Sequence, residues 1–185
     1  FCNVKTGRPL PVDLKEPLRV ARTVKLMKLK HCVLTSVDRD DLDDLGAEIW
    51  ILTVQAIKKM NPGITIETLI PDFDAQKEFI GKVCAAGQEV VSHNLETVRR
   101  ITPWARSRAK YEVSLETLKI ISESEVVTKS GIMVGLGETS DEVIETLKDM
   151  RSVGVDVITI GQYLQPSKKH LMVKEYVTPE QFEDY

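Results

Sequence analysis

The sequence has few of the features that mark secreted, membrane-spanning or nucleic-acid-binding proteins. Only 3 of its 185 residues are cysteine, and this odd number does not build a framework of disulfides. A reducing compartment such as the cytosol is therefore the expected location. No apolar run approaches the roughly 20 residues that a membrane-spanning helix needs; residues 49–54 form one of the longest. With 25 basic against 28 acidic side chains, the net charge of −3 indicates no basic surface for nucleic acid.

The overall composition is typical of a globular protein. Hydrophobic residues make up 42% of the chain and charged residues 29%, and a chain of this length is long enough to bury roughly 70% of its unfolded surface in one domain. No low-complexity segment or linker interrupts it. The chain starts at Phe1, and Thr178 and Pro179 mark the beginning of a helix close to its end. We therefore expect the central part of a longer protein.

The most informative stretch is residues 128–139, where three glycines interrupt an apolar run just before a helix. Thr139 precedes Glu142 at the spacing of a capping box, and apolar residues then recur at helical spacing. A further strand follows, which completes a parallel βαβ unit. Gly135 and Gly137 would allow a ligand to approach the backbone closely. A tight turn without a ligand would give the same pattern.

Comparable units recur along the chain, and their alternation predicts a parallel sheet. Because no dinucleotide-binding fingerprint is present, we favour an α/β fold built as a partial or full parallel βα barrel over a Rossmann sheet. The expected strands are residues 32–37, 64–70, 89–92, 126–134 and 155–160, and the expected helices are residues 18–29, 47–60, 75–86, 96–101, 114–122 and 142–153.

Polar side chains follow five of these strands, and ligands of βα barrels bind at the carboxyl ends of the strands. An asparagine and a carboxylate two residues apart, such as Asn94 and Glu96, can bind both hydroxyls of a ribose. Two alternatives stay open: the acidic residues 40–44 can cap the next helix, and His93 can be a structural hydrogen-bond donor. Because polar residues recur after all five strands, we favour a site for a ribose and an amino acid. The residues concerned are Thr35, Ser36, Asp38, Arg39, Asp40, Asp72, His93, Asn94, Glu96, Gly135, Glu138, Gln162 and Gln165.

The three cysteines differ in their setting. Cys32 and Cys84 fall in an expected strand and an expected helix, and we interpret them as inert buried thiols. Cys2 lies in a loop before the first helix, from which it could reach the mouth of a barrel. No pair of cysteines has the spacing of a metal site.

Taken in order, six segments resemble the lipoyl synthase family of radical S-adenosylmethionine (SAM) enzymes. The resemblance runs from one end of the chain to the other, which makes it specific. Biotin synthase shares the pieces around residues 93–96 and 135–138 but not residues 162–167. The segments are FCNVKTGRP (1–9), LTSVDRDDL (34–42), IPDF (70–73), HNLETV (93–98), KSGIMVGLGET (129–139) and TIGQYLQPS (159–167).

The resemblance implies a radical reaction. Cys2 matches the third cysteine of a C-x3-C-x2-C loop that holds a 4Fe–4S cluster, whose free iron chelates the methionine part of SAM. One electron from a donor protein then cleaves SAM to a 5′-deoxyadenosyl radical. This radical takes hydrogen from an octanoyl chain on a lysine of a lipoyl-domain or glycine-cleavage carrier protein, and a second cluster is consumed as the source of sulfur. No side chain of this sequence is expected to act as a catalytic acid or base, because such groups cannot activate these C–H bonds.

The resemblance also assigns residues to SAM. Asn94 and Glu96 match the pair expected on the ribose. Ser36 and Asp38 fall where the family meets the methionine amino group, and Gly135 matches the turn beside the adenine.

Some family features are absent from the 185 residues. These are the first two cysteines of the loop, the cysteines of the auxiliary cluster and a downstream serine ligand, and Met172 stands where the family usually has proline. Because the barrel motifs are intact, we interpret residues 1–185 as one radical SAM barrel domain, truncated at both ends. Its expected location is the cytoplasm, or the mitochondrion or plastid of a eukaryote. The competing hypotheses are another radical SAM sulfur-inserting enzyme such as biotin synthase, and a non-catalytic nucleotide-binding barrel.

Overall fold

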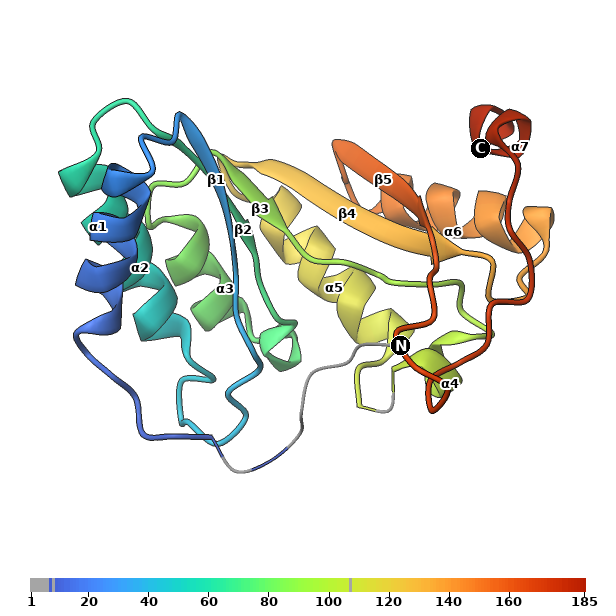
Figure 1. Ribbon diagram of the computed structural model, residues 1–185, viewed down its shortest axis with the longest axis horizontal. Coiled ribbons are helices and arrows are strands. Elements are labelled where there is room, and N and C mark those ends of the chain that lie inside the picture. The colour runs from blue at the N-terminus through green and yellow to red at the C-terminus, as the bar shows by residue number, and fades with distance from the viewer. Residues whose placement is uncertain (1–6, 8, 107) are drawn as a thin grey trace.

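A parallel sheet forms the centre of the structure, a computed structural model that describes residues 7, 9–106 and 108–185. Its five strands are β1 (His31–Thr35), β2 (Thr65–Leu69), β3 (Val90–Ser92), β4 (Val127–Val134) and β5 (Val157–Gln162). Every pairing is parallel, and the strands lie in the sheet in the order in which they occur in the chain (Figure 1). The carboxyl ends of all five strands therefore meet at one edge.

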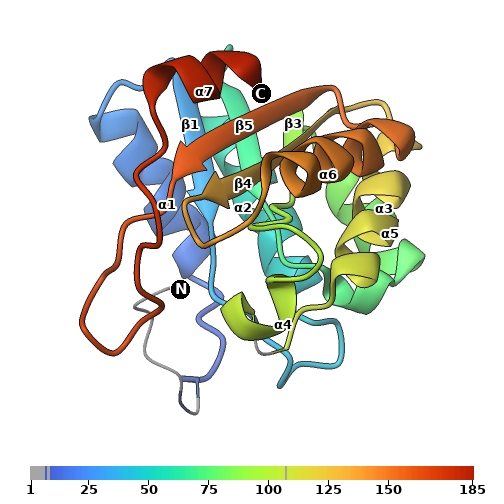
Figure 2. The ribbon, with the colours of Figure 1, turned by 90° about the vertical axis from the view of Figure 1, so that its right-hand side faces the viewer.

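Helices cover one face of the sheet. They are α1 (Glu16–Leu26), α2 (Ala47–Met60), α3 (Lys77–Cys84), α4 (Thr102–Ala105), α5 (Tyr111–Ser122), α6 (Ser140–Ser152) and α7 (Pro179–Asp184), with a short 3-10 turn at Phe73–Ala75. Right-handed connections between consecutive strands place the connecting helices on the same side. Accordingly α1 packs on α2, α2 on α3, α3 on α5 and α5 on α6. After β5 the chain turns back, and α7 ends near the start of α6 (Figure 2), where the hydroxyls of Tyr185 and Ser140 lie 3.4 Å apart.

The strand side chains alternate between the helix-covered face and an open face, which we call the inner face. Ile66, Val91 and Ile132 point to the helices and are buried in the core. On the inner face Val33 is 56% exposed and Val127 is 41% exposed. The sheet is thus an open, partial parallel βα barrel, as the sequence predicts.

Most expected elements are present with ends shifted by a few residues, and the capping box of α6 is confirmed. The Thr139 hydroxyl accepts from the backbone N–H of Glu142, and the Glu142 carboxylate accepts from that of Thr139. Thr178 likewise caps α7, with Pro179 at its first position. None of the helices in the described part of the chain combines the length and the apolar character needed to cross a membrane.

The expected helix over residues 96–101 is wrong. Glu96 has a left-handed backbone with φ +70° and forms a parallel bridge with Ile132. Its N–H donates to the carbonyl of Gly131, and its carbonyl accepts from the N–H of Met133. The chain therefore continues the line of β3 up to Glu96, and helix begins only at Thr102. Pairing with β4 overrides the local helical pattern.

Candidate functional site at the carboxyl edge of the sheet

Asn94 and Glu96 follow β3. The Asn94 side chain lies on the inner face beside Gly131, and it forms a hydrogen bond with the Glu96 carboxylate. A Cβ atom at Gly131 of β4 would lie 3.0 Å from the Asn94 Oδ1 and 2.7 Å from the Thr159 Oγ1. Gly131 therefore leaves the room that the side chains of Asn94 and Thr159 occupy. The sequence did not single out Gly131 or Thr159, since neither follows a strand.

The half-buried guanidinium of Arg106 lies near carboxylates that follow three different strands. Arg106, in the loop after α4, faces Glu96, Asp72 and Asp38, and burial lowers its pKa in spite of them. Burial raises the pKa of Glu96, and Arg106 and a hydrogen bond from Asn94 oppose this rise. A carboxylate that is partly withdrawn from water and has few partners is a strong acceptor for ligand hydroxyls. The sequence analysis did not include Arg106 among the residues of the site.

The pKa of Asp38 is also raised. Partial burial is the main cause, the neighbouring carboxylates of Asp40 and Asp72 add to it, and Arg106 and Arg108 oppose it. Arg108 forms an ion pair with Asp40 at 2.9 Å. The end of β1 therefore adds a second carboxylate of raised pKa to the edge, although the Asp38 residue is exposed.

Other polar residues after β1 have structural partners. The Ser36 side chain is exposed and donates to the carbonyl of Val37 at 3.0 Å. Asp41 pairs with Arg39, and the Asp44 carboxylate accepts from the backbone N–H groups of Gly46 and Glu48 at the start of α2. The capping alternative is therefore confirmed for Asp44.

His93 is structural. It points to the helix layer, where it is 2% exposed, with Nδ1 2.9 Å from the carbonyl oxygen of Ile70 and Nε2 2.9 Å from the Ser114 Oγ. Arg106 donates to the same Ser114 oxygen at 2.9 Å. This assigns the chain of donors: Arg106 to Ser114, Ser114 to Nε2, and Nδ1–H to the carbonyl. Burial lowers the pKa of His93 to about 4, so the ring is neutral.

The glycine turn between β4 and α6 is held by the chain itself. Gly135 has φ +99° and Gly137 has φ +102°, which only glycine adopts without strain. The Glu138 carboxylate accepts from the backbone N–H groups of Gly135 and Leu136.

The segment after β5 packs against the same turn. A Cβ at Gly135 would lie 2.3 Å from the Gln162 Nε2 and 2.5 Å from the Glu175 carbonyl oxygen. The Lys174 N–H donates to the carbonyl of Gly135 at 2.8 Å. Contacts within the chain are therefore sufficient to require glycine at position 135.

The cysteines of the described residues lie away from this edge. Cys32 and Cys84 are buried, and burial raises the pKa of both thiols, which confirms the expectation of inert cysteines. Cys2 lies outside the described residues. Within the described part of the chain, no group of three histidine, cysteine or acidic side chains could hold a metal ion.

A partial parallel βα barrel with polar side chains and a glycine turn at its carboxyl edge belongs to the class of βα-barrel proteins, which bind their ligands at that edge. The model of the Radical SAM superfamily matches residues 1–150. The chain therefore belongs to the Radical SAM superfamily, which implies SAM and a 4Fe–4S cluster. The residues present fit a nucleoside. The Glu96 carboxylate is shielded from water and lies beside Asn94, whose side chain is on the open face. The backbone of Glu96 is strained, as is common at binding sites.

Curated relatives resemble the whole chain. It is 60% identical over 186 aligned residues to lipoyl synthase of Flavobacterium psychrophilum, with 100% of this chain and 64% of the relative covered. It is 59% identical to lipoyl synthase of Parabacteroides distasonis, of which it covers 66%, and 59% identical to mitochondrial lipoyl synthase of Nematostella vectensis, of which it covers 64%. The chain thus spans slightly less than two thirds of these relatives.

Solved structures of low sequence identity share the fold. Methylornithine synthase (PylB) matches with a TM-score of 0.72 at 16% identity, over 95% of this chain and 50% of that chain. Coproporphyrinogen III oxidase (HemN) from Escherichia coli matches with a TM-score of 0.64 at 14% identity, over 91% of this chain and 42% of that chain.

Proposed function

We propose that this chain is the barrel part of a lipoyl synthase. The reaction is the insertion of sulfur at C6 and C8 of an octanoyl chain that is attached to a lysine of a carrier protein. The observation that carries the proposal is the identity of 59–60% over the whole chain to proteins named lipoyl synthase. The strand-end site supports it, because it offers the groups that SAM needs.

In this proposal the side chains at the carboxyl edge hold SAM. Asn94 and Glu96 bind the ribose hydroxyls. The position of Asn94 beside Gly131 on the open face and its hydrogen bond with Glu96 support this role. Ser36 and Asp38 meet the methionine amino group, and Gly135 lies beside the adenine. Arg106 opposes the rise that burial causes in the pKa of Glu96 and so favours the carboxylate form, which accepts from hydroxyls.

Cys2 is proposed as a ligand of the 4Fe–4S cluster, and the other ligands of this cluster and of an auxiliary cluster belong to parts of the protein beyond this chain. The bound groups supply a radical that can remove hydrogen from an unactivated carbon. The protein contributes the binding of SAM, the position of the acyl chain and the exclusion of water. The proposed partners are an octanoylated lipoyl-domain or glycine-cleavage carrier protein and an electron donor protein. The proposed compartment is the cytoplasm, or an organelle in a eukaryote.

The test uses the full-length protein under anaerobic conditions with reductant, SAM and an octanoyl-lysine peptide, followed by mass spectrometry. The expected result is a lipoyl peptide formed through a monothiolated intermediate. Cys2→Ala is expected to lose SAM cleavage and part of the bound iron, whereas Cys32→Ala keeps both. Sulfur insertion into dethiobiotin, with none into the octanoyl peptide, would identify a biotin synthase instead.

A further inference from the structure

Arg100 connects the segment after Glu96 to the glycine turn. Its Nε donates to the Glu142 Oε1 at 2.6 Å, and its Nη2 donates to the Glu142 Oε2 at 2.9 Å. The same Nη2 donates to the carbonyl oxygen of Gly137 at 2.9 Å. Arg100 follows Glu96 closely in the chain, on the connection that leaves β3. One guanidinium therefore joins the connection after Glu96 to the glycine turn that follows β4 and to α6.

The partner of Arg100 is itself fixed. Glu142 closes the capping box of α6 through the N–H of Thr139 at 2.8 Å. The hydrogen bond from Arg100 is the main cause that lowers the pKa of Glu142 to about 2, so the ion pair is complete at neutral pH. On the inner side of the same turn, the Glu138 carboxylate holds Gly135 and Leu136. Arg100 is thus the outer support of a turn that Glu138 supports from within.

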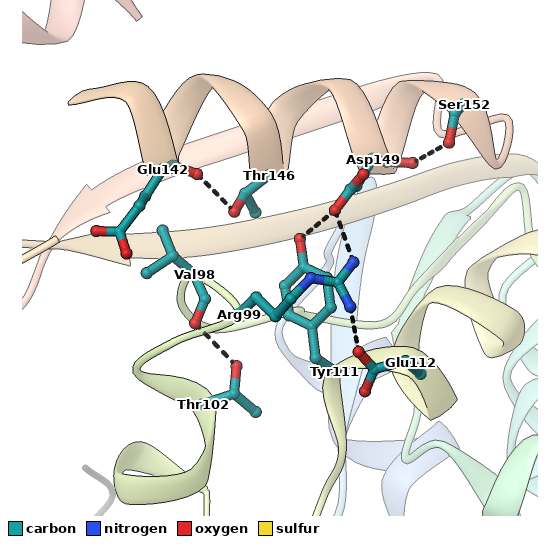
Figure 3. Close-up of polar contacts among 9 residues, drawn as sticks. All are labelled: Val98, Arg99, Thr102, Tyr111, Glu112, Glu142, Thr146, Asp149 and Ser152. Carbon is teal, nitrogen blue, oxygen red and sulfur yellow. Dashed lines mark hydrogen bonds and ion pairs between the residues drawn. The ribbon is translucent and has the colours of Figure 1, made fainter. Parts of the chain in front are cut away.

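The neighbouring arginine has the same type of contacts but no link to the turn. Arg99 pairs with Glu112 of α5 and Asp149 of α6, and its guanidinium lies 4.3 Å from the centre of the Tyr111 ring (Figure 3). Its side chain is 50% exposed and that of Arg100 is 49% exposed. Arg99 is therefore a matched control for the loss of a half-exposed arginine from the same connection.

We propose that Arg100 is a positioning residue for the nucleotide part of SAM. By binding Gly137 and Glu142 at once, it ties the glycine turn to the connection that follows the Asn94–Glu96 pair. Without it, the turn keeps its contact with Glu138 but loses its attachment to this connection. This inference rests on the proposed function only because it takes SAM as the ligand. It does not depend on which substrate the radical attacks.

The test compares Arg100→Met, Arg100→Lys and Arg99→Met in full-length protein reconstituted anaerobically with its cluster. Calorimetry measures the Kd of SAM, kinetics measure SAM cleavage, and hydrogen exchange without SAM measures the amides of residues 135–139. Arg100→Met is expected to raise the Kd and KM for SAM about threefold to tenfold and to speed exchange in the turn. The rate at saturating SAM should change by less than about twofold, because Arg100 touches no reacting atom.

The control variants separate positioning from general stability. Arg100→Lys is expected to recover part of the affinity, since an ammonium keeps the charge but lacks the planar fork that reaches both partners. Arg99→Met is expected to leave the Kd and the exchange of the turn unchanged. An equal rise of the Kd in Arg99→Met, or wild-type exchange and affinity in Arg100→Met, would overturn the proposal. Failure of the wild type to bind SAM would instead count against the proposed function, and the exchange data would still decide the role of Arg100.

Discussion

Gly131 illustrates how a missing side chain shapes the candidate site. The space that its Cβ would take is used by the Asn94 Oδ1 and the Thr159 Oγ1. Gly161, two residue pairs along the β4–β5 ladder from Gly131, has no atom within 4 Å of the position where its Cβ would lie. The two glycines of the inner face therefore differ in what a methyl group would displace.

We expect Gly131→Ala to move Asn94 and weaken SAM binding by roughly 1–2 kcal/mol, the order of one misplaced hydrogen bond. Gly161→Ala is expected to keep wild-type affinity. Calorimetry with SAM on both reconstituted variants is the measurement. Equal affinities for the two variants would show that Asn94 does not contact the ligand.

The protonation of His93 makes the stability of the protein depend on pH. The ring is buried and neutral, with a pKa of about 4 against 6.5 for a free histidine. Below pH 6.5 the unfolded chain binds a proton that the folded chain does not bind. Stability from this group is therefore fully present above pH 6.5 and is lost as the pH falls toward 4.

In this window we expect the free energy of unfolding to fall by about 1.4 kcal/mol per pH unit because of His93. His93→Gln should be less stable at neutral pH but should lack this component of the slope. Urea unfolding followed by circular dichroism at several pH values between 7 and 5 measures both. Parallel slopes in the wild type and the variant would contradict the assignment.

At the scale of elements, the sequence predicts what local patterns determine. The capping box of α6 is readable from Thr139 and Glu142 because both partners lie within one turn of helix. The strands are readable from short apolar runs. The path of residues 96–101 is not, since the left-handed Glu96 results from its bridge to Ile132 on another strand.

The same reasoning explains which site residues could be predicted. Asn94 and Glu96 could be predicted as a pair because they lie two residues apart directly after a strand, and their side chains are hydrogen-bonded in the structure. Arg106 could not be assigned, because its position depends on Ser114 and on carboxylates from separate strand ends. Gly131 and Thr159 meet only when β4 and β5 are paired.

The cap of α6 gives a prediction at this scale. Thr139→Ala removes the acceptor for the N–H of Glu142 and is expected to cost about 1 kcal/mol of unfolding free energy. Thr178→Ala removes the equivalent acceptor from the short helix α7, whose residues are not buried, and its effect on global unfolding should be smaller. Thermal and urea unfolding compare the two. A larger effect at Thr178 would mean that α7 contributes more to the fold than its exposure indicates.

At the scale of the whole molecule, an ion pair on the inner face ties together the three central strands. The Lys129 Nζ lies 2.9 Å from both carboxylate oxygens of Glu67, and Ser92 on the strand between them donates to the same carboxylate at 3.2 Å. The Glu67 side chain is 11% exposed and that of Lys129 is 26% exposed. The pair thus fixes β2, β3 and β4 relative to one another.

Lys129→Met leaves a nearly buried carboxylate without its cation and is expected to cost about 2–3 kcal/mol of unfolding free energy. Glu67→Gln should cost less, because the lysine that remains is better solvated. The double variant is expected to be more stable than the sum of the single effects predicts, which a double-mutant cycle in urea measures. Additive effects would show that the pair does not act as a unit.

The consecutive order of the strands has a consequence for the way the protein is made. Each strand pairs with the strand before it in the chain, and each long helix packs on the previous long helix. When a βα unit leaves the ribosome, the surface on which it packs has therefore already been synthesised, and folding can proceed from the amino-terminal side during translation. From β2 onward, each strand finds an earlier strand already in place as its first partner, and only β1 has to wait for the strand that follows it.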